Sequence, residues 1–337
     1  LTPTAYNDGK VLCVKPSEPP YGDFDFSRAT TKTRINSLGV IESVALGVPA
    51  INYAGFSYDG SGNVIPDSGC GSWLFEPQST SLFPYSSDYT QWNKSGSMVI
   101  TSNNAISPDG TQNASLLTAN AANQFIYLSV SAAANSTISL YIKRKTGTGD
   151  IELSNNGGSS YTVLSVTDEW NRVQVTFAAS TFQTVIKINT SGDEIYLWGV
   201  QLEALSYASS LIPTSGSTVT RNQDLCTNGG SAALINSESG VLYAEIAALA
   251  NDGSNRVIQL SDGSNSNRIF IGYWSASNEI RMLVQVGGVT QAFGGNTSYD
   301  ILDFNKIAFK YKENDFALWI NGTEVITDTS GITFPIS

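Results

Sequence analysis

Apolar and polar residues alternate along short runs through most of this chain, and turn signals separate one run from the next. An alternation with a period of two places apolar side chains on one face of a β-strand and polar side chains on the other. The turn signals include Asp-Gly at positions 8, 59, 109, 252 and 262, and Asn-Gly at positions 156, 228 and 321. Dense turns of this kind are typical of antiparallel β-structure joined by hairpins. The pattern predicts an all-β protein without a long amphipathic helix, in which residues 86–92 form one helical turn capped by Ser87 or Asp88.

Residues 80–212 have the pattern of one antiparallel β-sandwich. The predicted strands are residues 97–101, 124–130, 137–143, 150–153, 161–166, 170–177, 184–188 and 195–202. In the strand at 170–177, Asn171, Val173, Val175 and Phe177 share one face. This face is predicted to be buried, and the opposite face is predicted to be in contact with water.

Residues 226–337 have the pattern of a second sandwich. The predicted strands are residues 240–249, 256–261, 268–274, 279–286, 289–293, 305–311, 315–320 and 323–328. Asn321-Gly322 separates the last two strands and is the strongest type I′ hairpin signal in the chain. The fold class predicted for the whole chain is therefore tandem antiparallel β-sandwiches.

The remaining residues form an irregular extended N-terminal segment and a connector. Residues 1–79 contain an extended stretch, a turn at 36–39 and a further strand, and we expect them to pack on neighbouring parts of the protein. Residues 213–225 are rich in Pro, Ser, Thr and Gly. Pro213 cannot donate a ladder hydrogen bond, so a linker between domains is predicted here. The predicted domains are thus 1–79, 80–212 and 226–337, with the linker at 213–225.

Composition narrows the classes of function. The chain has 18 Lys and Arg against 29 Asp and Glu, which gives a formal net charge of −11. This balance argues against a nucleic-acid partner, because nucleic-acid-binding proteins carry a clustered basic face. No apolar run approaches the length of a transmembrane helix, so no membrane insertion is expected. The absence of histidine excludes Ser-His-Asp and Cys-His catalysis and removes the most common zinc ligand.

Two further features bear on catalysis and compartment. The adjacent carboxylates Asp168-Glu169 and Asp193-Glu194 are weak candidates for a glycosidase pair, because neighbours on a strand point to opposite faces. The three cysteines are too few for a disulfide framework, although a Cys13–Cys70 bridge is an alternative. The N-terminus lacks the basic start and apolar core of a signal peptide.

Three stretches resemble sequences of bacteriophage virion proteins. The first is Phe26-Ser-Arg-Ala29 and the second is Leu74-Phe-Glu-Pro-Gln78. The third runs from Glu194-Ile-Tyr-Leu-Trp-Gly-Val-Gln-Leu-Glu-Ala through Tyr207-Ala-Ser-Ser-Leu-Ile-Pro-Thr to Arg221-Asn-Gln-Asp224. In phage tail-fibre, head-fibre and tail-spike proteins, a string like the third joins a carbohydrate-binding-type jelly roll to a following domain.

The last predicted hairpin carries a second resemblance. Residues 316–325, with the preceding 306–311, resemble a hairpin of concanavalin-like, laminin-G-type lectin sandwiches. Such sandwiches usually end with one or two more strands. We therefore expect the sequence to be a fragment of a longer protein, or its last strands to come from elsewhere.

Together the resemblances imply a jelly roll at 80–212, a concanavalin-like sandwich at 226–337 and a non-enzymatic place on the virion surface. They imply a homotrimer that contacts other virion proteins and displays modules for attachment to host glycans. They transfer no catalytic residue. The alternatives are a carbohydrate-binding accessory region of a glycan-degrading enzyme and a bacterial surface adhesin, because the same folds occur in those classes.

A glycan site needs an aromatic face on which a sugar ring packs, with amide or carboxylate groups for the hydroxyls. The candidates are aromatic residues beside polar neighbours or loops: Tyr127, Tyr161, Tyr273, Trp274 and Trp319. Trp198 alternates with other apolar residues in its strand and is expected to lie in a core.

Structural Ca²⁺ is the one cofactor that the sequence suggests. Its oxygen ligands would come from loop carboxylates. The candidates are Asp252, Asp262, Asp300 and Asp303. The alternative for each is a solvated carboxylate.

Overall fold

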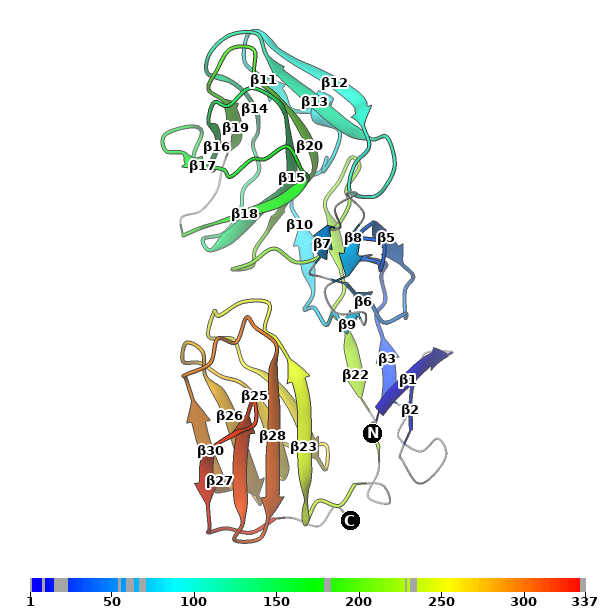
Figure 1. The fold of residues 1–337 in the computed structure, drawn as a ribbon, viewed down its shortest axis with the longest axis vertical. Coiled ribbons are helices and arrows are strands. Elements are labelled where there is room, and N and C mark those ends of the chain that lie inside the picture. The colour runs from blue at the N-terminus through cyan, green and yellow to red at the C-terminus, as the bar shows by residue number, and fades with distance from the viewer. Residues whose placement is uncertain are drawn as a thin grey trace. The chain divides into compact units, whose positions relative to one another are not determined.

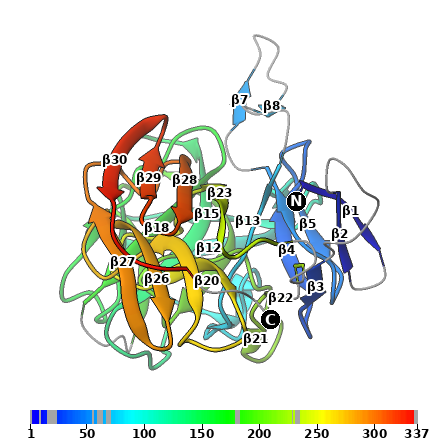
Figure 2. The same cartoon turned by 90° about the horizontal axis from the view of Figure 1, so that it is seen from below.

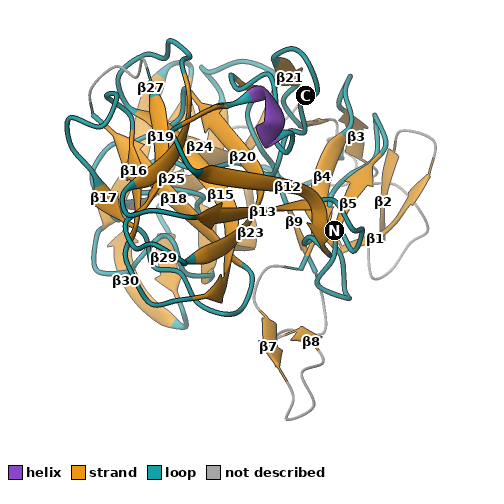
Figure 3. Cartoon of the chain, turned by 90° about the horizontal axis from the view of Figure 1, so that it is seen from above, coloured by secondary structure: helices purple, strands orange, loops and turns teal. Residues whose placement is uncertain are grey.

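The computed structural model describes residues 2–7, 10–14, 24–53, 56–58, 64–66, 71–178, 183–227, 229–230 and 235–333. These residues form an all-β protein, as predicted, and the only helical element among them is the 3₁₀ turn η1 (Tyr89–Gln91), capped by Asp88 (Figure 3). The chain divides into two compact units (Figure 1). One comprises residues 6–11 and Asp25–Thr227, and the other comprises residues 1–5, 12–24 and Asn228–Ser337.

The first sandwich consists of two five-stranded sheets. One sheet has the order β11 (Asn93–Lys94), β14 (Gln124–Leu128), β19 (Thr184–Ile188), β16 (Ile151–Ser154) and β17 (Thr162–Val163). The other has the order β12 (Met98–Ala105), β13 (Ala114–Ala119), β20 (Glu194–Glu203), β15 (Ser136–Thr146) and β18 (Asn171–Phe177). Most connections cross from one sheet to the other, which is the jelly-roll arrangement.

Its core lies between the two sheets and is built from the inward positions of their strands, among them Ile126, Ile138 and Leu197. On the predicted buried face of β18, Val173, Val175 and Phe177 pack against this core and are half-buried, whereas Asn171 is exposed. The strand predicted at 161–166 is shorter, since only Thr162–Val163 pair.

Strand β13 was absent from the predicted set. Its sequence, Ala-Ser-Leu-Leu-Thr-Ala, is almost continuously buried and has no apolar–polar alternation. The reason is its central place between β12 and β20, with cover on both faces. Leu117 belongs to the sandwich core, whereas Ala114 faces a second core on the other side of the sheet.

This second core contains Trp198, which was expected to be buried. The ring of Trp198 is buried with Tyr141, Leu211 and Ile41 on the outer face of the sheet that contains β20. Ile41 comes from the hairpin β4 (Lys32–Ile35) and β5 (Ile41–Val44), whose turn at Asn36 to Gly39 was predicted. The β4–β5 hairpin is therefore packed on the outer face of this sheet of the first sandwich.

The other elements of the N-terminal region are short. They are β1 (Thr2–Asn7), β2 (Lys10–Val14), β3 (Phe24–Ser27), β6 (Ile51–Asn52), β7 (Phe56–Tyr58), β8 (Val64–Pro66), β9 (Ser72–Trp73) and β10 (Ser79–Ser81). Two pairings tie this region to the connector: β10 pairs with β21 (Val219–Arg221), and β3 pairs with β22 (Leu225–Thr227). The Cys13–Cys70 alternative lies outside the residues whose side chains the structure describes.

The second sandwich consists of two four-stranded sheets. One has the order β23 (Ser239–Ile246), β28 (Asn305–Lys312), β29 (Phe316–Ile320) and β30 (Thr323–Asp328). The other has the order β24 (Arg256–Ser261), β25 (Arg268–Tyr273), β26 (Ile280–Val286) and β27 (Val289–Asn296). Figure 2 shows β28, β29 and β30 in one layer and β26 and β27 in the other.

All eight strands predicted for this sandwich are present, and the bounds of β24 and β30 are those predicted. Asn321 and Gly322 have φ values of 51° and 85°, as a type I′ turn requires. Asn321 also accepts a hydrogen bond from the backbone N–H of Lys306 (2.9 Å), which fixes the turn to the neighbouring strand.

Candidate functional site

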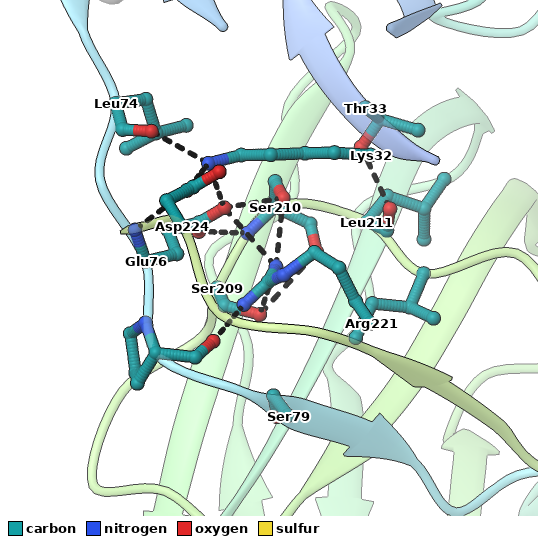
Figure 4. Close-up of polar contacts among 12 residues, drawn as sticks. Lys32, Thr33, Leu74, Glu76, Ser79, Ser209, Ser210, Leu211, Arg221 and Asp224 are labelled. Atoms are coloured by element: carbon teal, nitrogen blue, oxygen red, sulfur yellow. Dashed lines mark hydrogen bonds and ion pairs between the residues drawn. The ribbon is translucent and has the colours of Figure 1, made fainter. Parts of the chain in front are cut away.

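Five charged side chains from distant parts of the sequence meet in the unit that contains the first sandwich, and Figure 4 shows four of them, Lys32, Glu76, Arg221 and Asp224. The five are Arg28 after β3, Lys32 at the start of β4, Glu76 after β9, Arg221 at the end of β21 and Asp224 before β22. None of these side chains is more than 2% exposed. We call this cluster the ionic junction.

Asp224 is the centre of one half of the ionic junction. Its carboxylate accepts hydrogen bonds from Arg28 Nη1 (2.8 Å), Lys32 Nζ (2.6 Å) and the backbone N–H of Glu76 (2.9 Å). Lys32 Nζ also donates to the carbonyl of Leu74 (2.6 Å) and lies 2.9 Å from Glu76 Oε2. The three hydrogens of the ammonium group therefore have three acceptors, as a buried lysine requires.

Glu76 is the centre of the other half. Its carboxylate lies 3.1 Å from Arg221 Nη1 and accepts hydrogen bonds from the backbone N–H (2.6 Å) and Oγ (2.7 Å) of Ser210. Burial by itself raises the pKa of the Glu76 carboxyl. The charges of Arg221 and Lys32 and the hydrogen bonds outweigh burial, so the pKa of Glu76 is held below its ordinary value.

Arg221 connects the ionic junction to the sandwich. Its guanidinium donates to the carbonyl of Pro77 (2.8 Å) and to the hydroxyl of Ser209 (3.0 Å). Ser209 in turn donates from its backbone N–H (2.9 Å) and its hydroxyl to Glu203, at the end of β20. Glu203 is fully buried and also accepts from Ser79 Oγ (2.7 Å). A continuous polar network thus runs from the connector into the last strand of the sandwich.

Such a network specifies structure more than it adds stability. Burying charges is costly, and a buried pair is worth keeping only when every partner is satisfied. Here Arg28, Lys32 and Arg221 face the carboxylates of Glu76 and Asp224, so removing either carboxylate leaves buried cations without a partner. The ionic junction therefore allows one arrangement of the N-terminal segment, the sandwich and the connector.

The structure shows how residues 213–227, which include the predicted linker, are held. Residues 219–221 pair with β10, residues 225–227 pair with β3, and Arg221 and Asp224 are buried. The pairing partners of these residues come from the N-terminal segment. The boundary between compact units follows Thr227.

Two of the sequence-predicted glycan residues, Tyr127 and Tyr161, lie on the outer face of the sheet that contains β14 and β19. Ile126 and Ile186 point into the core, so their strand neighbours Phe125, Tyr127 and Lys187 point outward.

Contacts link the outward side chains. The rings of Phe125 and Tyr127 are 6.0 Å apart, and Lys187 Nζ lies 4.1 Å from the centre of the Tyr161 ring. Lys187 also pairs with Glu152 of β16 (2.7 Å). We call Phe125, Tyr127, Glu152, Tyr161 and Lys187 the aromatic face; all five are half-buried.

The three candidates of the second sandwich are not brought together in this way. Tyr273 is 2% exposed, and its hydroxyl donates to the carbonyl of Ile246 (2.8 Å), so this ring belongs to the core. Trp274 stacks on Phe270 with ring centres 5.5 Å apart, and the guanidinium of Arg281 lies 4.9 Å from its ring centre.

Trp319 is half-buried on the outer face of β29. Lys310 Nζ lies 5.8 Å from its ring centre.

The four candidate calcium ligands have other partners in their own loops. Asp252 pairs with Arg256 (3.0 Å), and Asp300 accepts from the backbone N–H of Leu302 (2.9 Å). Asp303 donates its backbone N–H to the carbonyl of Asp300 (3.4 Å).

Hydrogen bonds from Ser264 and Asn267 lower the pKa of Asp262. Among the residues that the structure describes, no three Asp, Glu, Cys or His side chains are grouped so that they could hold a metal ion.

Sequence reasoning missed the ionic junction. The chain has only 14% charged residues, yet Arg28, Glu76, Arg221 and Asp224 all occur inside the stretches that resemble phage proteins. Phe125 and Lys187 of the aromatic face could have been found from their alternation with core positions.

Comparison with models of known protein families finds no match to this chain, and comparison with curated protein sequences finds no significant relative. No helix among the described residues is long and apolar enough to cross a membrane.

Proposed function

We propose that this chain is a non-enzymatic structural component of a bacteriophage virion, a fibre or spike subunit that displays β-sandwiches. The observation that carries the proposal is the composition of the ionic junction. Arg28 comes from the Phe-Ser-Arg-Ala stretch, Glu76 from the Leu-Phe-Glu-Pro-Gln stretch, and Arg221 and Asp224 from the connector string. The three stretches on which the resemblance rests thus form one physical unit.

A fixed connector suits a fibre better than a tethered enzyme module. A flexible linker lets a binding module search around a catalytic domain. In this chain the connector is paired with β3 and β10 and anchored by buried ion pairs.

The carboxylates also favour a non-enzymatic role. Glycosidases need two carboxylates that face a common substrate. Asp193 is 4% exposed and pairs with Arg144 (3.3 Å), whereas Glu194 pairs with Lys145 (3.0 Å). Each is engaged with a different cation, so Asp193 and Glu194 are not poised together for acid–base work.

We further propose that the aromatic face is where a host glycan attaches. The β4–β5 hairpin packs on Trp198, on the outer face of the sheet that contains β20. The aromatic face lies on the other sheet of the sandwich, which this hairpin does not cover. Tyr127 and Phe125 offer ring surfaces, and the Lys187–Glu152 pair offers a donor and an acceptor for hydroxyls. Because this pair is internally neutral, binding should depend only weakly on salt.

The first test is the solution mass of the full chain by light scattering, followed by sedimentation with candidate host cells. A trimer that sediments with cells and is released when periodate oxidises their surface glycans supports the proposal. Tyr127→Ala should reduce this binding about tenfold or more, since stacked rings contribute strongly to such contacts.

Phe304→Ala, at an exposed aromatic residue of the other sandwich (56%), is the control and should bind cells as the unchanged chain does. A monomer that shortens a polysaccharide would overturn the proposal.

A further inference from the structure

One side of the second sandwich leaves its apolar interior partly open. The sandwich is closed where β27 contacts β30. The opposite side ends in β23 and β24, each the last strand of its sheet, and no other described strand pairs with either (Figure 1). Leu242 and Leu260 pack on the core but are only half-buried, and Ile258, on the same face of β24 as Leu260, is 41% exposed.

The outer face of β23 is apolar as well. Val241 is 62% exposed and Tyr243 is 56% exposed. Natural edge strands are usually protected from further pairing by lysine, proline, a bulge or a short length. The eight residues of β23, Ser-Gly-Val-Leu-Tyr-Ala-Glu-Ile, include neither lysine nor proline, and their pairing with β28 is continuous. This edge is therefore open to another strand.

The sequence of β23 is complementary to itself. In an antiparallel pair of two β23 strands centred on Leu242, Val241 of each copy lies opposite Tyr243 of the other, on the same outer face. Pairs of an aromatic and a β-branched residue are favourable across strands. Glu245 of each copy then lies opposite Ser239 of the other, so no two like charges face each other.

We propose that β23 is the surface through which two copies of this chain associate, by antiparallel β23–β23 pairing about a two-fold axis. The unpaired main-chain groups of an edge select an extended polypeptide rather than a saccharide. The pairing joins the two β23 sheets into one continuous sheet and buries Val241 and Tyr243 of both copies. It does not depend on the proposed virion function, and within a virion it would link neighbouring subunits or fibres.

The test compares the full chain with the double variant Val241→Lys/Tyr243→Lys by analytical ultracentrifugation over a wide concentration range. Both side chains are exposed, so the variant should fold, which the circular dichroism spectrum and melting temperature check. The unchanged chain should double in mass as its concentration rises. The double variant should need at least about tenfold higher concentration to do so.

Val289→Lys is the matched control, because Val289 is a similarly exposed valine of the same sandwich (61%) away from β23. It should associate as the unchanged chain does. Hydrogen exchange gives a second readout, since amides of β23 should become protected at high concentration in the unchanged chain alone. Equal association of the unchanged chain and the folded double variant would overturn the proposal.

The same data separate this inference from the proposed function. If the chain forms the expected trimer, the unchanged protein should pass from trimers to pairs of trimers, and the double variant should stop at trimers. Loss of the trimer in both would count against the fibre proposal only. A trimer that never pairs in either would count against the role of β23 only.

Discussion

Replacing Asp224 by alanine should destabilise the unit of the first sandwich more than any surface substitution. The change removes the acceptor of three hydrogen bonds, from Arg28 Nη1 (2.8 Å), Lys32 Nζ (2.6 Å) and the N–H of Glu76 (2.9 Å). Arg28 and Lys32 have fully buried side chains, so water cannot replace the lost carboxylate without opening the structure. Removing one partner of a buried ion pair costs about 3–5 kcal/mol.

Calorimetry of the full chain measures this loss through the transition of the unit Asp25–Thr227. For a unit of this size each kcal/mol lowers the melting temperature by about 2–4 °C, so we expect a decrease of about 6–20 °C. Asp224→Asn keeps the shape and removes the charge. It should be nearly as destabilising, because an amide has one oxygen to offer two cations.

Glu169→Ala is the control in the same unit. Glu169 lies 3.9 Å from Lys143 Nζ, and its side chain is 72% exposed. An exposed pair of this kind contributes at most about 1 kcal/mol. If Asp224→Ala lowers the melting temperature no more than Glu169→Ala does, the ionic junction does not hold these segments together and the reasoning is wrong.

Three further predictions concern separate parts of the structure. Because the pKa of Glu76 is lowered on folding, the stability that its carboxylate contributes is fully present above the ordinary pKa of 4.5 and is lost as the pH falls through the folded pKa. The urea midpoint of the unchanged chain should therefore decline below about pH 5, and Glu76→Gln should flatten this decline. Trp198→Ala should cost about 3–5 kcal/mol and speed proteolysis of the β4–β5 hairpin, and an unchanged cleavage rate would argue against the second core. Gly322→Ala should lower the free energy of unfolding of the second sandwich alone by about 1–2 kcal/mol, measured by denaturation, because a φ of 85° is unfavourable for alanine. An added Cβ meets no atom within 4 Å, so the backbone conformation is the whole cause.

The candidate sites show where sequence reasoning reaches its limit. Tyr127 and Tyr161 were identified as ring surfaces beside polar neighbours, and the structure places both on the aromatic face. Tyr273 has a similar local sequence but lies in the core, because its side chain points from β25 into the sandwich. The neighbouring Trp274 is engaged by Phe270 of the preceding strand β25 and by Arg281 of the adjacent strand β26.

The ionic junction could not be derived from local pattern at all. Arg28 and Asp224 are 196 positions apart, and their pairing depends on how the N-terminal segment folds back over the sandwich. A charged residue in a short irregular stretch has the same local sequence whether it is solvated or paired. Only the three-dimensional arrangement distinguishes the two, because the cost of burial is offset by partners from other segments.

The amino-acid sequence by itself determined the β-class, most strands of both sandwiches and the turn at Asn321-Gly322. These features depend on short-range periodicity and backbone preference, which act within a few residues. The tertiary structure decided that the connector pairs with β3 and β10, that Trp198 lies in a second core and that the charges of the ionic junction are buried. These depend on contacts between distant segments, whose free energies arise only when desolvated groups meet their partners.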